Sequence, residues 1–305
     1  MLNTPTPMTS NHSSQPDQAM SLNCHLSWRQ RKLIVRSLAQ QESISLPPLN
    51  QADWLQNCLE RSPVTLIKLD PTIGEEALTF WANACHAAKK PAYLSIRSVP
   101  DLPQKQQQLN WKVKRCLDWI VAALLLVLLS PMMLGLACLI KIWMPGPILF
   151  QQWRVGARGK LFKIIKFRTM VVGAENLHHQ VMGRQTGLHK LLDDPRVTPL
   201  GRFMRKYSLD ELPQLFNVLR GEMSLVGPRP WALYDAVRIS PELQHRLNAL
   251  PGVTGSWQVQ ARSHLRDLNF VNRQDLHYLS TWSIWCDLKW LVLTIPKVLS
   301  GFGAY

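Results

Sequence analysis

The sequence has few acidic residues and no grouped cysteines. Asp and Glu together number 20, against 35 Lys and Arg, which gives a formal net charge of +15. An excess of this size indicates an anionic partner: nucleic acid, anionic lipid headgroups or phosphorylated substrates. The six cysteines show neither C-x-x-C spacing nor grouping with histidine. We therefore expect free thiols rather than a disulfide framework or a zinc site.

The chain also has only one long apolar segment and no recognisable signal peptide. Its 305 residues, enough for two domains, are 46% hydrophobic but contain a single long uncharged run, which excludes a disordered chain and a polytopic transporter. Residues 1–27 are rich in Ser, Thr, Asn, Gln and Pro and lack a basic segment followed by an apolar one. We predict a disordered tail there and not a signal peptide.

Residues 28–100 alternate between strand and helix patterns. Aliphatic runs predict strands at residues 32–36, 64–69 and 92–96, and helical patterns lie between them at 53–61 and 75–89. This alternation is typical of a small parallel α/β module. No glycine-rich phosphate-binding loop follows any of these strands, so the module is assigned no chemistry. Residues 101–110 are interpreted as a linker to a different kind of domain.

The one long uncharged run covers Trp119–Ile140, 22 residues. By length alone it could cross a bilayer as one helix. Ser130 and Pro131 lie in its middle, and Pro131 has no N–H to donate and clashes with the carbonyl of Val127, which predicts a kink or a break. The Ser130 hydroxyl can bond back to a carbonyl one turn earlier.

The charges around this run are balanced. Four Lys or Arg residues lie in the 20 residues before it and four in the 20 after it, whereas a spanning helix is oriented by an asymmetry between its ends. Tryptophans flank both ends, as interfacial anchors do. A re-entrant hairpin over residues 119–143, entering and leaving on one face, explains the break and the balance. A kinked spanning helix is the alternative from the pattern alone.

A strongly basic segment follows. Six Lys or Arg and no acidic residue occur between Arg154 and Arg168, and four more cations lie between Arg196 and Lys206. The simplest interpretation is a solvated surface that contacts anionic lipid. A nucleic-acid partner would require a docking element or interleaved stacking aromatics. The sequence offers neither, so we expect no nucleic acid.

An adjacent carboxylate pair, Asp210 and Glu211, comes next. One interpretation is a helix start, because Ser208 and Glu211 have the spacing of a capping box. The other is phosphoryl chemistry, in which one carboxylate attacks phosphorus, the other holds a divalent metal, and nearby cations accept phosphate charge. The many cations and the preceding membrane segment favour the second interpretation.

Further motifs follow one another in a fixed order. They are Pro145-Gly146-Pro147, Gln152-x-Arg154-Val155-Gly156, Lys166-Phe167-Arg168-Thr169-Met170, Asp194-Pro195-Arg196-Val197-Thr198, Ser208-Leu209-Asp210-Glu211-Leu212-Pro213-Gln214, Gly227-Pro228-Arg229-Pro230, Pro251-Gly252-Val253-Thr254-Gly255 and Asp275-x-x-Tyr278. With these motifs, the chain from about Trp111 to Tyr305 resembles the bacterial sugar transferases, which are monotopic phosphoglycosyl transferases.

The resemblance implies a fold and an activity. The alternating pattern predicts an α/β-type N-terminal module, which lies outside the resemblance. For residues 111–305 the resemblance implies a mainly α (α+β) membrane domain, with a re-entrant hairpin broken at Ser130-Pro131. The activity is transfer of a sugar 1-phosphate from a nucleotide diphosphate sugar, in particular a UDP-sugar, to polyprenyl (undecaprenyl) phosphate. This step starts the assembly of exopolysaccharide, capsule or O-antigen.

The resemblance also implies roles for individual residues. Asp210 attacks the β-phosphorus and forms a covalent phosphosugar intermediate, and Glu211 is the ligand of a Mg²⁺ cofactor. The candidates for binding substrate phosphate are Arg205, Arg229, Lys166 and Arg168.

A location and an alternative function complete the expectations. The protein is expected on the bacterial inner membrane, monotopic, with its catalytic domain on the cytosolic face and membrane lipid as a partner; a homo-oligomer is compatible with this arrangement. The alternative is a non-catalytic membrane adaptor whose basic surface binds anionic lipid. Between Trp282 and Leu299 apolar residues recur at intervals of three and four, forming a helix face that fits either core packing or the membrane interface.

Overall fold

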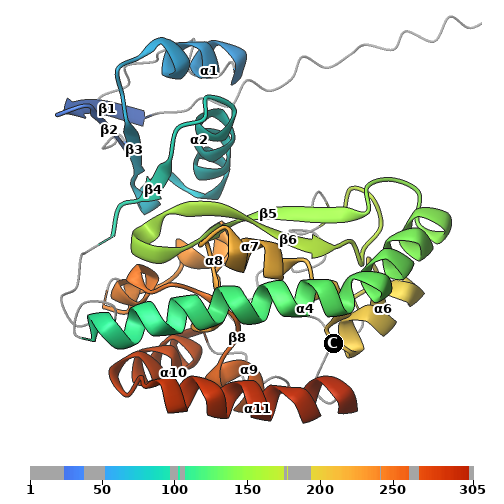
Figure 1. Ribbon diagram of the computed structural model, residues 1–305. Helices are drawn as coiled ribbons and strands as arrows, with labels where there is room; N and C mark the ends of the chain where they lie inside the picture. Colours follow the sequence, from blue (N-terminus) through green and yellow to red (C-terminus); the bar gives the residue numbers. More distant parts are fainter. Residues whose placement is uncertain are drawn as a thin grey trace, which may run out of the picture.

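The fold was analysed in a computed structural model. It describes residues 24–37, 52–96, 102–103, 107–174, 177, 194–240, 242–260 and 268–301. The expectation of a disordered tail falls outside these ranges except at residues 24–27. In Figure 1 a small α/β part in blue and cyan lies above a β-hairpin, and helices of the C-terminal half fill the space below it.

The N-terminal part is a four-stranded sheet in the order β1-β2-β3-β4. Strands β2 (Lys32–Ser37), β3 (Leu66–Leu69) and β4 (Ala92–Leu94) are parallel. The connections carry α1 (Ala52–Arg61), the short η2 (Pro71–Ile73) and α2 (Glu75–Ala87). These strands and helices lie where the alternating pattern predicted them, within three residues at each end.

Residues 24–27 were predicted to belong to a disordered tail. They instead form part of strand β1 (Cys24–Arg29), which pairs antiparallel with β2. The two strands are joined by Gln30 and Arg31, both with positive φ, 46° and 61°. Two-residue hairpin turns of this shape are normally recognised by Asn-Gly or Asp-Gly, since glycine and asparagine tolerate positive φ. Gln-Arg gives no such signal, so the hairpin is not visible in the sequence.

A single long helix, α4 (Gln108–Trp143), connects the N-terminal and C-terminal parts. Among the described residues it is the one helix long and apolar enough to cross a membrane, and only 11% of its most apolar window is buried in protein. It begins inside the predicted linker 101–110. Figure 1 shows α4 crossing the molecule and changing direction in its C-terminal part.

The expected break at Ser130 and Pro131 is not a break in the helix, which continues through both residues. Pro131 cannot donate to the carbonyl of Val127, the normal partner of an N–H at that position. The Ser130 hydroxyl donates to this carbonyl instead, at 2.8 Å. The orphaned acceptor is thereby satisfied locally, which explains how helical geometry persists through the proline.

Two cations counted before the apolar run turn out to be inside the protein. Lys114 is buried and forms an ion pair with Asp287, with 2.5 Å between Nζ and Oδ2. Arg115 donates to Asp118 at 2.9 Å and to the Met223 carbonyl. These side chains attach α4 to the rest of the fold and are not surface cations. The predicted balance of four charges against four therefore overstates the basic surface before the apolar run.

The C-terminal half begins with an antiparallel hairpin, β5 (Leu149–Val155) and β6 (Leu161–Phe167), joined by η3 (Ala157–Gly159). The elements that follow are α6 (Pro199–Lys206), η4 (Leu209–Glu211), α7 (Gln214–Leu219), β7 (Ser224–Val226), α8 (Leu233–Ala236), η5 (Gln244–Asn248), β8 (Gly252–Thr254), α9 (Ser256–Gln260), α10 (Leu268–Ser280) and α11 (Ile284–Ser300). Strands β7 and β8 pair in parallel. Helix and strand therefore mix throughout this half, as the α+β expectation required.

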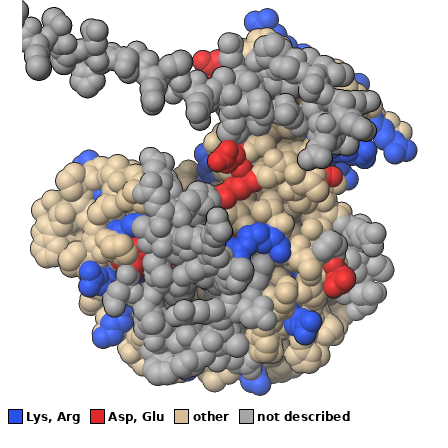
Figure 2. All heavy atoms as spheres, turned by 180° about the vertical axis from the view of Figure 1, so that it is seen from behind, with Lys and Arg blue, Asp and Glu red and all other residues tan. Residues whose placement is uncertain are grey.

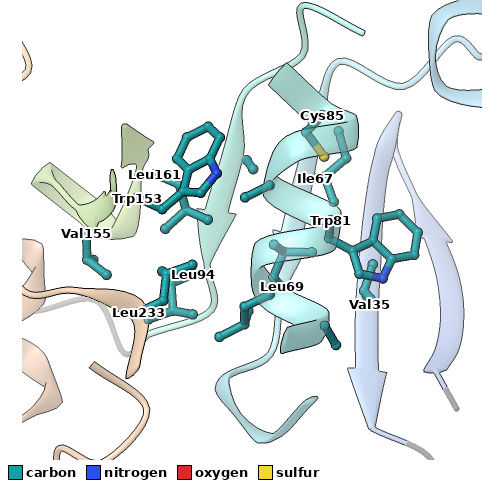
Figure 3. Packing of buried hydrophobic residues seen from close by; sticks show 14 of the residues in the cluster. Val35, Ile67, Leu69, Trp81, Cys85, Leu94, Trp153, Val155, Leu161 and Leu233 are labelled. Carbon is teal, nitrogen blue, oxygen red and sulfur yellow. The ribbon is translucent and has the colours of Figure 1, made fainter. Parts of the chain in front are cut away.

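One hydrophobic core crosses the predicted linker. Buried residues of β2, β3, α2 and β4 pack with Trp153 and Val155 of β5 and with Trp231 and Leu233 near α8. Figure 3 shows these side chains meeting, with Trp153, Val155 and Leu233 on one side of Leu94 and Trp81 beyond it. The N-terminal part is thus packed against the C-terminal half and is not a separate body on a linker.

Helix α11 has an exposed apolar face. It starts at Ser283, whose hydroxyl accepts from the Cys286 N–H, and ends at Gly301 in the left-handed region. Trp290 faces the core, whereas the residues spaced by three and four are exposed: Trp285, Leu288, Val292, Ile295 and Leu299. Of the face recognised in the sequence, only Trp282 is buried. Core packing is therefore the wrong interpretation for most of this face.

Candidate active site

The predicted carboxylate pair lies at a polar pocket between the β5–β6 hairpin and the β7–β8 pair. The pocket encloses about 270 Å³ of space, part of it open to solvent. Its charged and amide side chains are Arg154, Lys166, Glu211, Gln214, Arg229 and Gln258. Three cations and one carboxylate thus converge on one small space, a combination suited to a multiply charged anion and a divalent metal.

A tight turn directs the two carboxylates differently. Helix α6 starts at Thr198, whose hydroxyl accepts from the Gly201 N–H, and it ends at Lys206. Ser208 then takes a left-handed conformation with φ 55°, and η4 follows. The Ser208 side chain makes no cap hydrogen bond, so the capping-box interpretation is wrong. Left-handed backbone is costly for serine, and here it leaves Asp210 buried while Glu211 reaches the pocket.

Lys166 holds Glu211 from the facing strand. Its Nζ donates to Glu211 Oε1 at 2.7 Å, and about a fifth of each side chain is exposed. Lys166 lies on β6, and the buried Asn217 of α7 fixes this strand by accepting from the Ile165 N–H and donating to the Lys163 carbonyl. The side chain of Asn217 therefore sets the position of the strand that carries Lys166.

The environment of Asp210 is buried and cationic. Burial raises the pKa of Asp210, and the neighbouring Glu211 carboxylate adds to this rise, whereas Lys166 and Arg205 lower it. Removal from water disfavours the charged form, and a nearby opposite charge favours it. The two cations are therefore the groups that favour the ionised carboxylate in this buried position.

Arg205 is the second cation near Asp210. Its Nε donates to the hydroxyl of buried Thr169 at 3.0 Å. Burial lowers the pKa of Arg205, and the carboxylates of Asp210 and Asp194 oppose that effect. Thr169 belongs to the same motif as Lys166, so one short segment supplies one cation of the site and a hydrogen-bond partner of the other.

Arg229 is carried by a segment whose backbone is bonded at four successive carbonyls. The Pro228 carbonyl accepts from the Gly252 N–H at 2.8 Å, and the Trp231 carbonyl accepts from the Val155 N–H at 3.0 Å. Between them, Arg246 donates to the Arg229 carbonyl at 2.5 Å and Arg154 donates to the Pro230 carbonyl at 3.1 Å. We call residues 227–231 the Arg229 segment. Pro228 and Pro230 have no backbone N–H to donate. Two of the four carbonyls of this segment accept hydrogen bonds from arginine side chains.

Arg168 does not join this group. Its guanidinium is buried and donates to the carbonyls of Met144 and Pro145, directly after α4. The structure thus attaches Arg168 to the end of the apolar helix. Of the residues predicted for the site, Lys166, Glu211 and Arg229 line the pocket, and Asp210 and Arg205 lie against this group.

Several pocket residues were not predicted as site residues. Arg154 and Gln258 line the pocket, and Arg246 is paired with Asp275 beneath the Arg229 segment. A signal was present, because Arg154 and Asp275 both belong to motifs that were recognised. Their spacing alone does not tell a pocket residue from a core residue, so they received no role.

Gly252 makes the close backbone packing of the Arg229 segment possible. A Cβ there would collide with the backbone N of Gly227. We expect Gly252→Ala to destabilise the protein by roughly 1–3 kcal/mol, the range for overpacking, and to lower the affinity of the pocket for its ligand. Gly135→Ala is the matched control, because nothing lies within 4 Å of its added Cβ. Equal melting temperatures in the two variants would contradict this prediction.

The carboxylates fit a metal that also binds substrate. No group of three or more His, Cys, Asp or Glu side chains comes together in the part of the chain that the structure describes. Mg²⁺ commonly uses one or two protein carboxylates and takes its remaining ligands from water and substrate phosphates. Glu211, which lines the pocket, and Asp210 beside it meet that requirement.

Comparison with known proteins identifies related chains. The family model described as bacterial sugar transferase matches residues 109–301. A UDP-glucose:undecaprenyl-phosphate glucose-1-phosphate transferase of Caulobacter vibrioides is 42% identical over 220 residues, covering 70% of this chain and 78% of that protein. Galactosyl transferase CpsE of Streptococcus agalactiae serotype III is 44% identical over 162 residues, covering 52% of this chain and 36% of that protein.

A third relative is the undecaprenyl-phosphate galactose phosphotransferase of Salmonella typhimurium. It is 39% identical over 207 residues, which cover 63% of this chain and 42% of that protein. The matched part of the chain thus spans about two fifths of the length of the longer relatives.

Proposed function

Because the chain belongs to the bacterial sugar transferase family, we propose that it transfers a sugar 1-phosphate from a nucleotide diphosphate sugar to polyprenyl phosphate. The names of two of these relatives specify undecaprenyl phosphate, and one of the two specifies UDP-glucose. We extend this substrate class to the present chain, with a UDP-sugar as donor and the first step of exopolysaccharide or capsule assembly as its role.

The proposed reaction has two displacements at one phosphorus. The Asp210 carboxylate bonds to the β-phosphorus of the donor as the bond from this phosphorus to the bridging oxygen breaks, and nucleoside monophosphate leaves with that oxygen. A phosphate oxygen of polyprenyl phosphate then bonds to the same phosphorus, and the Asp210 carboxylate leaves. Both substrates are multiply anionic, so visiting the nucleophile in turn avoids bringing them together.

The cations around the pair have separate tasks in this proposal. Lys166 and Arg205 favour ionised Asp210, which must carry a negative charge to attack. Arg229 faces the pocket from a fixed backbone and binds phosphate charge with its planar fork. Glu211 would hold Mg²⁺, which neutralises diphosphate charge when bound.

The observation that carries this proposal is the buried carboxylate of Asp210 with the cations Lys166 and Arg205 near it. Arg154, Arg168 and Arg196 of the basic segments are all buried. In Figure 2 the basic side chains visible among the described residues are scattered over both parts of the molecule rather than gathered in one patch. A lipid-binding adaptor needs its cations at the surface and has no use for a buried Asp beside them, so the geometry counts against that alternative.

We further propose that both ends of α4 lie on one side of the inner membrane, the cytosolic side where nucleotide sugars occur. Support comes from the shared core, because Trp153 after α4 packs on residues that precede it. A spanning α4 would separate these partners by the bilayer. The exposed apolar faces of α4 and α11, joined by the Lys114–Asp287 pair, are where we place the lipid.

The direct test is turnover with a panel of nucleotide sugars, UDP-sugars first, together with undecaprenyl phosphate and Mg²⁺. The protein should release nucleoside monophosphate with at least one donor, and only when the lipid acceptor is present should release continue beyond one equivalent of enzyme. Lipid binding without turnover across the whole panel would favour the adaptor over the transferase.

Replacing either pocket-side arginine by lysine should slow the reaction. Arg205→Lys and Arg229→Lys keep the charge but lose the bidentate fork, and we expect at least a tenfold fall in kcat/KM, which corresponds to about 1.4 kcal/mol of barrier. Arg220→Lys, at an exposed arginine, is the control and should behave as wild type. Wild-type kinetics in both test variants would leave these arginines without a part in phosphate binding.

A further inference from the structure

The N-terminal module has no predicted chemistry, yet it touches the strand that carries Arg154. The indole Nε1 of Trp153 donates to Asn83 Oδ1 of α2 at 2.8 Å, and the ring of His86 packs edge-on against the indole at 5.6 Å between centroids. Lys163 lies 5.1 Å from the indole centroid. Trp153 is therefore held between α2 of the module and β6 of the C-terminal half.

A second contact joins backbone to backbone. Tyr93 of β4 forms an antiparallel bridge with Lys160, at the turn of the β5–β6 hairpin. A Cβ added to Gly159 would lie 2.5 Å from the Leu94 carbonyl, so a larger residue would push the hairpin away. The module thus contacts the hairpin both along β5 and at its turn.

These contacts lie directly beside the arginines of the pocket. Arg154 follows Trp153 and precedes Val155, and both neighbours belong to the core shared with the module. Trp231, two residues after Arg229, is fully buried in the same core. The Val155 N–H donates to the Trp231 carbonyl. Strand β5 and the Arg229 segment are therefore hydrogen-bonded to each other where both pack on the module.

We propose that the N-terminal module is a positioning element of the donor site. By packing on Trp153, Val155 and Trp231, it fixes the places of Arg154 and Arg229 before the nucleotide diphosphate sugar binds. Holding binding groups in place in advance lowers the cost of ordering them on binding. This inference rests on the proposed function, because it assigns the pocket to the anionic donor.

An inert module would be built differently. A domain that only tethers the enzyme or recruits a partner needs an exposed linker and a small polar interface. Here the module and the C-terminal half share one hydrophobic core, in which Trp231 is fully buried. The contacts of Trp153, Val155 and Trp231 place the module beside Arg154 and Arg229, so its effect should fall on donor binding rather than on the chemistry at Asp210.

The test compares interface variants with a variant that loosens the module elsewhere. Trp153→Ala removes the indole, and Asn83→Ala removes only its hydrogen-bond partner on the exposed side of α2. Leu55→Ala, in the buried face of α1, destabilises the module without touching Trp153. Trp153→Phe keeps an aromatic ring and tests for rescue. All are made in the full-length chain with melting temperature, donor KM and kcat measured for each.

We expect Trp153→Ala to raise the donor KM at least tenfold with a smaller change in kcat. Asn83→Ala should raise it about twofold to threefold, and Trp153→Phe should recover most of the loss. Leu55→Ala should lower the melting temperature as much as Trp153→Ala while its donor KM stays within twofold of wild type. If donor KM instead follows melting temperature through the whole set, the module is only a structural support and the proposal is wrong.

A readout independent of turnover separates this proposal from the assigned reaction. Hydrogen exchange of the Val155 amide reports the bond between β5 and Trp231 directly. We expect this exchange to quicken in Trp153→Ala and not in Leu55→Ala. Unchanged exchange in Trp153→Ala overturns the positioning role even in an active enzyme. Absence of wild-type turnover, with exchange changed as expected, counts against the reaction and not against the positioning of the two arginines.

Discussion

Asp210→Asn should abolish turnover, with a loss of at least 1000-fold, or about 4 kcal/mol of barrier. An amide is neutral and cannot form the acyl-phosphate bond that the proposed mechanism requires. The substitution nearly preserves the shape of a side chain that is buried against Lys166 and Arg205. The loss should therefore be chemical, with the fold retained.

The measurement is capture of the intermediate. Wild-type protein given donor labelled in the sugar, without the lipid acceptor, should retain label after denaturation, and Asp210→Asn should not. Asp53→Asn, at an exposed carboxylate on α1, should retain label as wild type does. Near-normal turnover in Asp210→Asn, or no trapped label on wild type, would falsify the covalent mechanism.

Glu211→Gln should also be severely slowed, because it loses both its metal-binding charge and its ion pair with Lys166.

Replacing Ser130 and Pro131 together by leucine should disturb the topology of the protein. The double variant restores an N–H at position 131 and removes the steric clash with the Val127 carbonyl. A straight apolar helix of 22 residues is about 33 Å long and matches the hydrocarbon core. Some molecules should then span the membrane with the N-terminal module on the opposite side, and activity should fall in proportion.

Cysteine labelling from outside intact cells measures this change. One probe is placed in the N-terminal tail and one after Gly301. Both should be protected in wild type, and the tail probe should become labelled in a fraction of Ser130→Leu/Pro131→Leu molecules. A Leu128→Ala/Leu129→Ala variant, which keeps the proline, is the control. Labelling of the wild-type tail with a protected C-terminal probe would show that α4 spans.

Local patterns predicted the regular elements of the N-terminal sheet but not its first strand. The aliphatic runs of β2, β3 and β4 are sufficient to predict strands. Strand β1 depends on the Gln30-Arg31 turn, which carries no sequence signal. The pairing of Lys114 with Asp287 was equally hidden. It joins residues far apart in sequence, and a cation before an apolar run is ordinarily read as a surface anchor.

The motifs named Lys166, Glu211 and Arg229, which the structure brings to one pocket, but they did not predict the direction of side chains that the backbone decides. Lys166 and Arg168 are two residues apart, so a continuing strand would place them on one face. Strand β6 ends at Phe167, and Arg168 turns instead to the carbonyls after α4. Conversely, Arg154 reaches the pocket because its neighbours Trp153 and Val155 face the shared core. The spacing of residues in the sequence does not predict which face of the strand Arg154 occupies.

The core shared across α4 also sets an order of events during synthesis of the chain. The module's last strand ends at Leu94, but Trp231 and Leu233, which pack on it, emerge about 140 residues later, roughly ten seconds at bacterial rates of elongation. The apolar helix leaves the ribosome within that interval. In the proposed topology, α4 therefore enters the lipid before Trp231 and Leu233 pack on the module. The packing contacts that keep the two ends of α4 on one side are completed only afterwards.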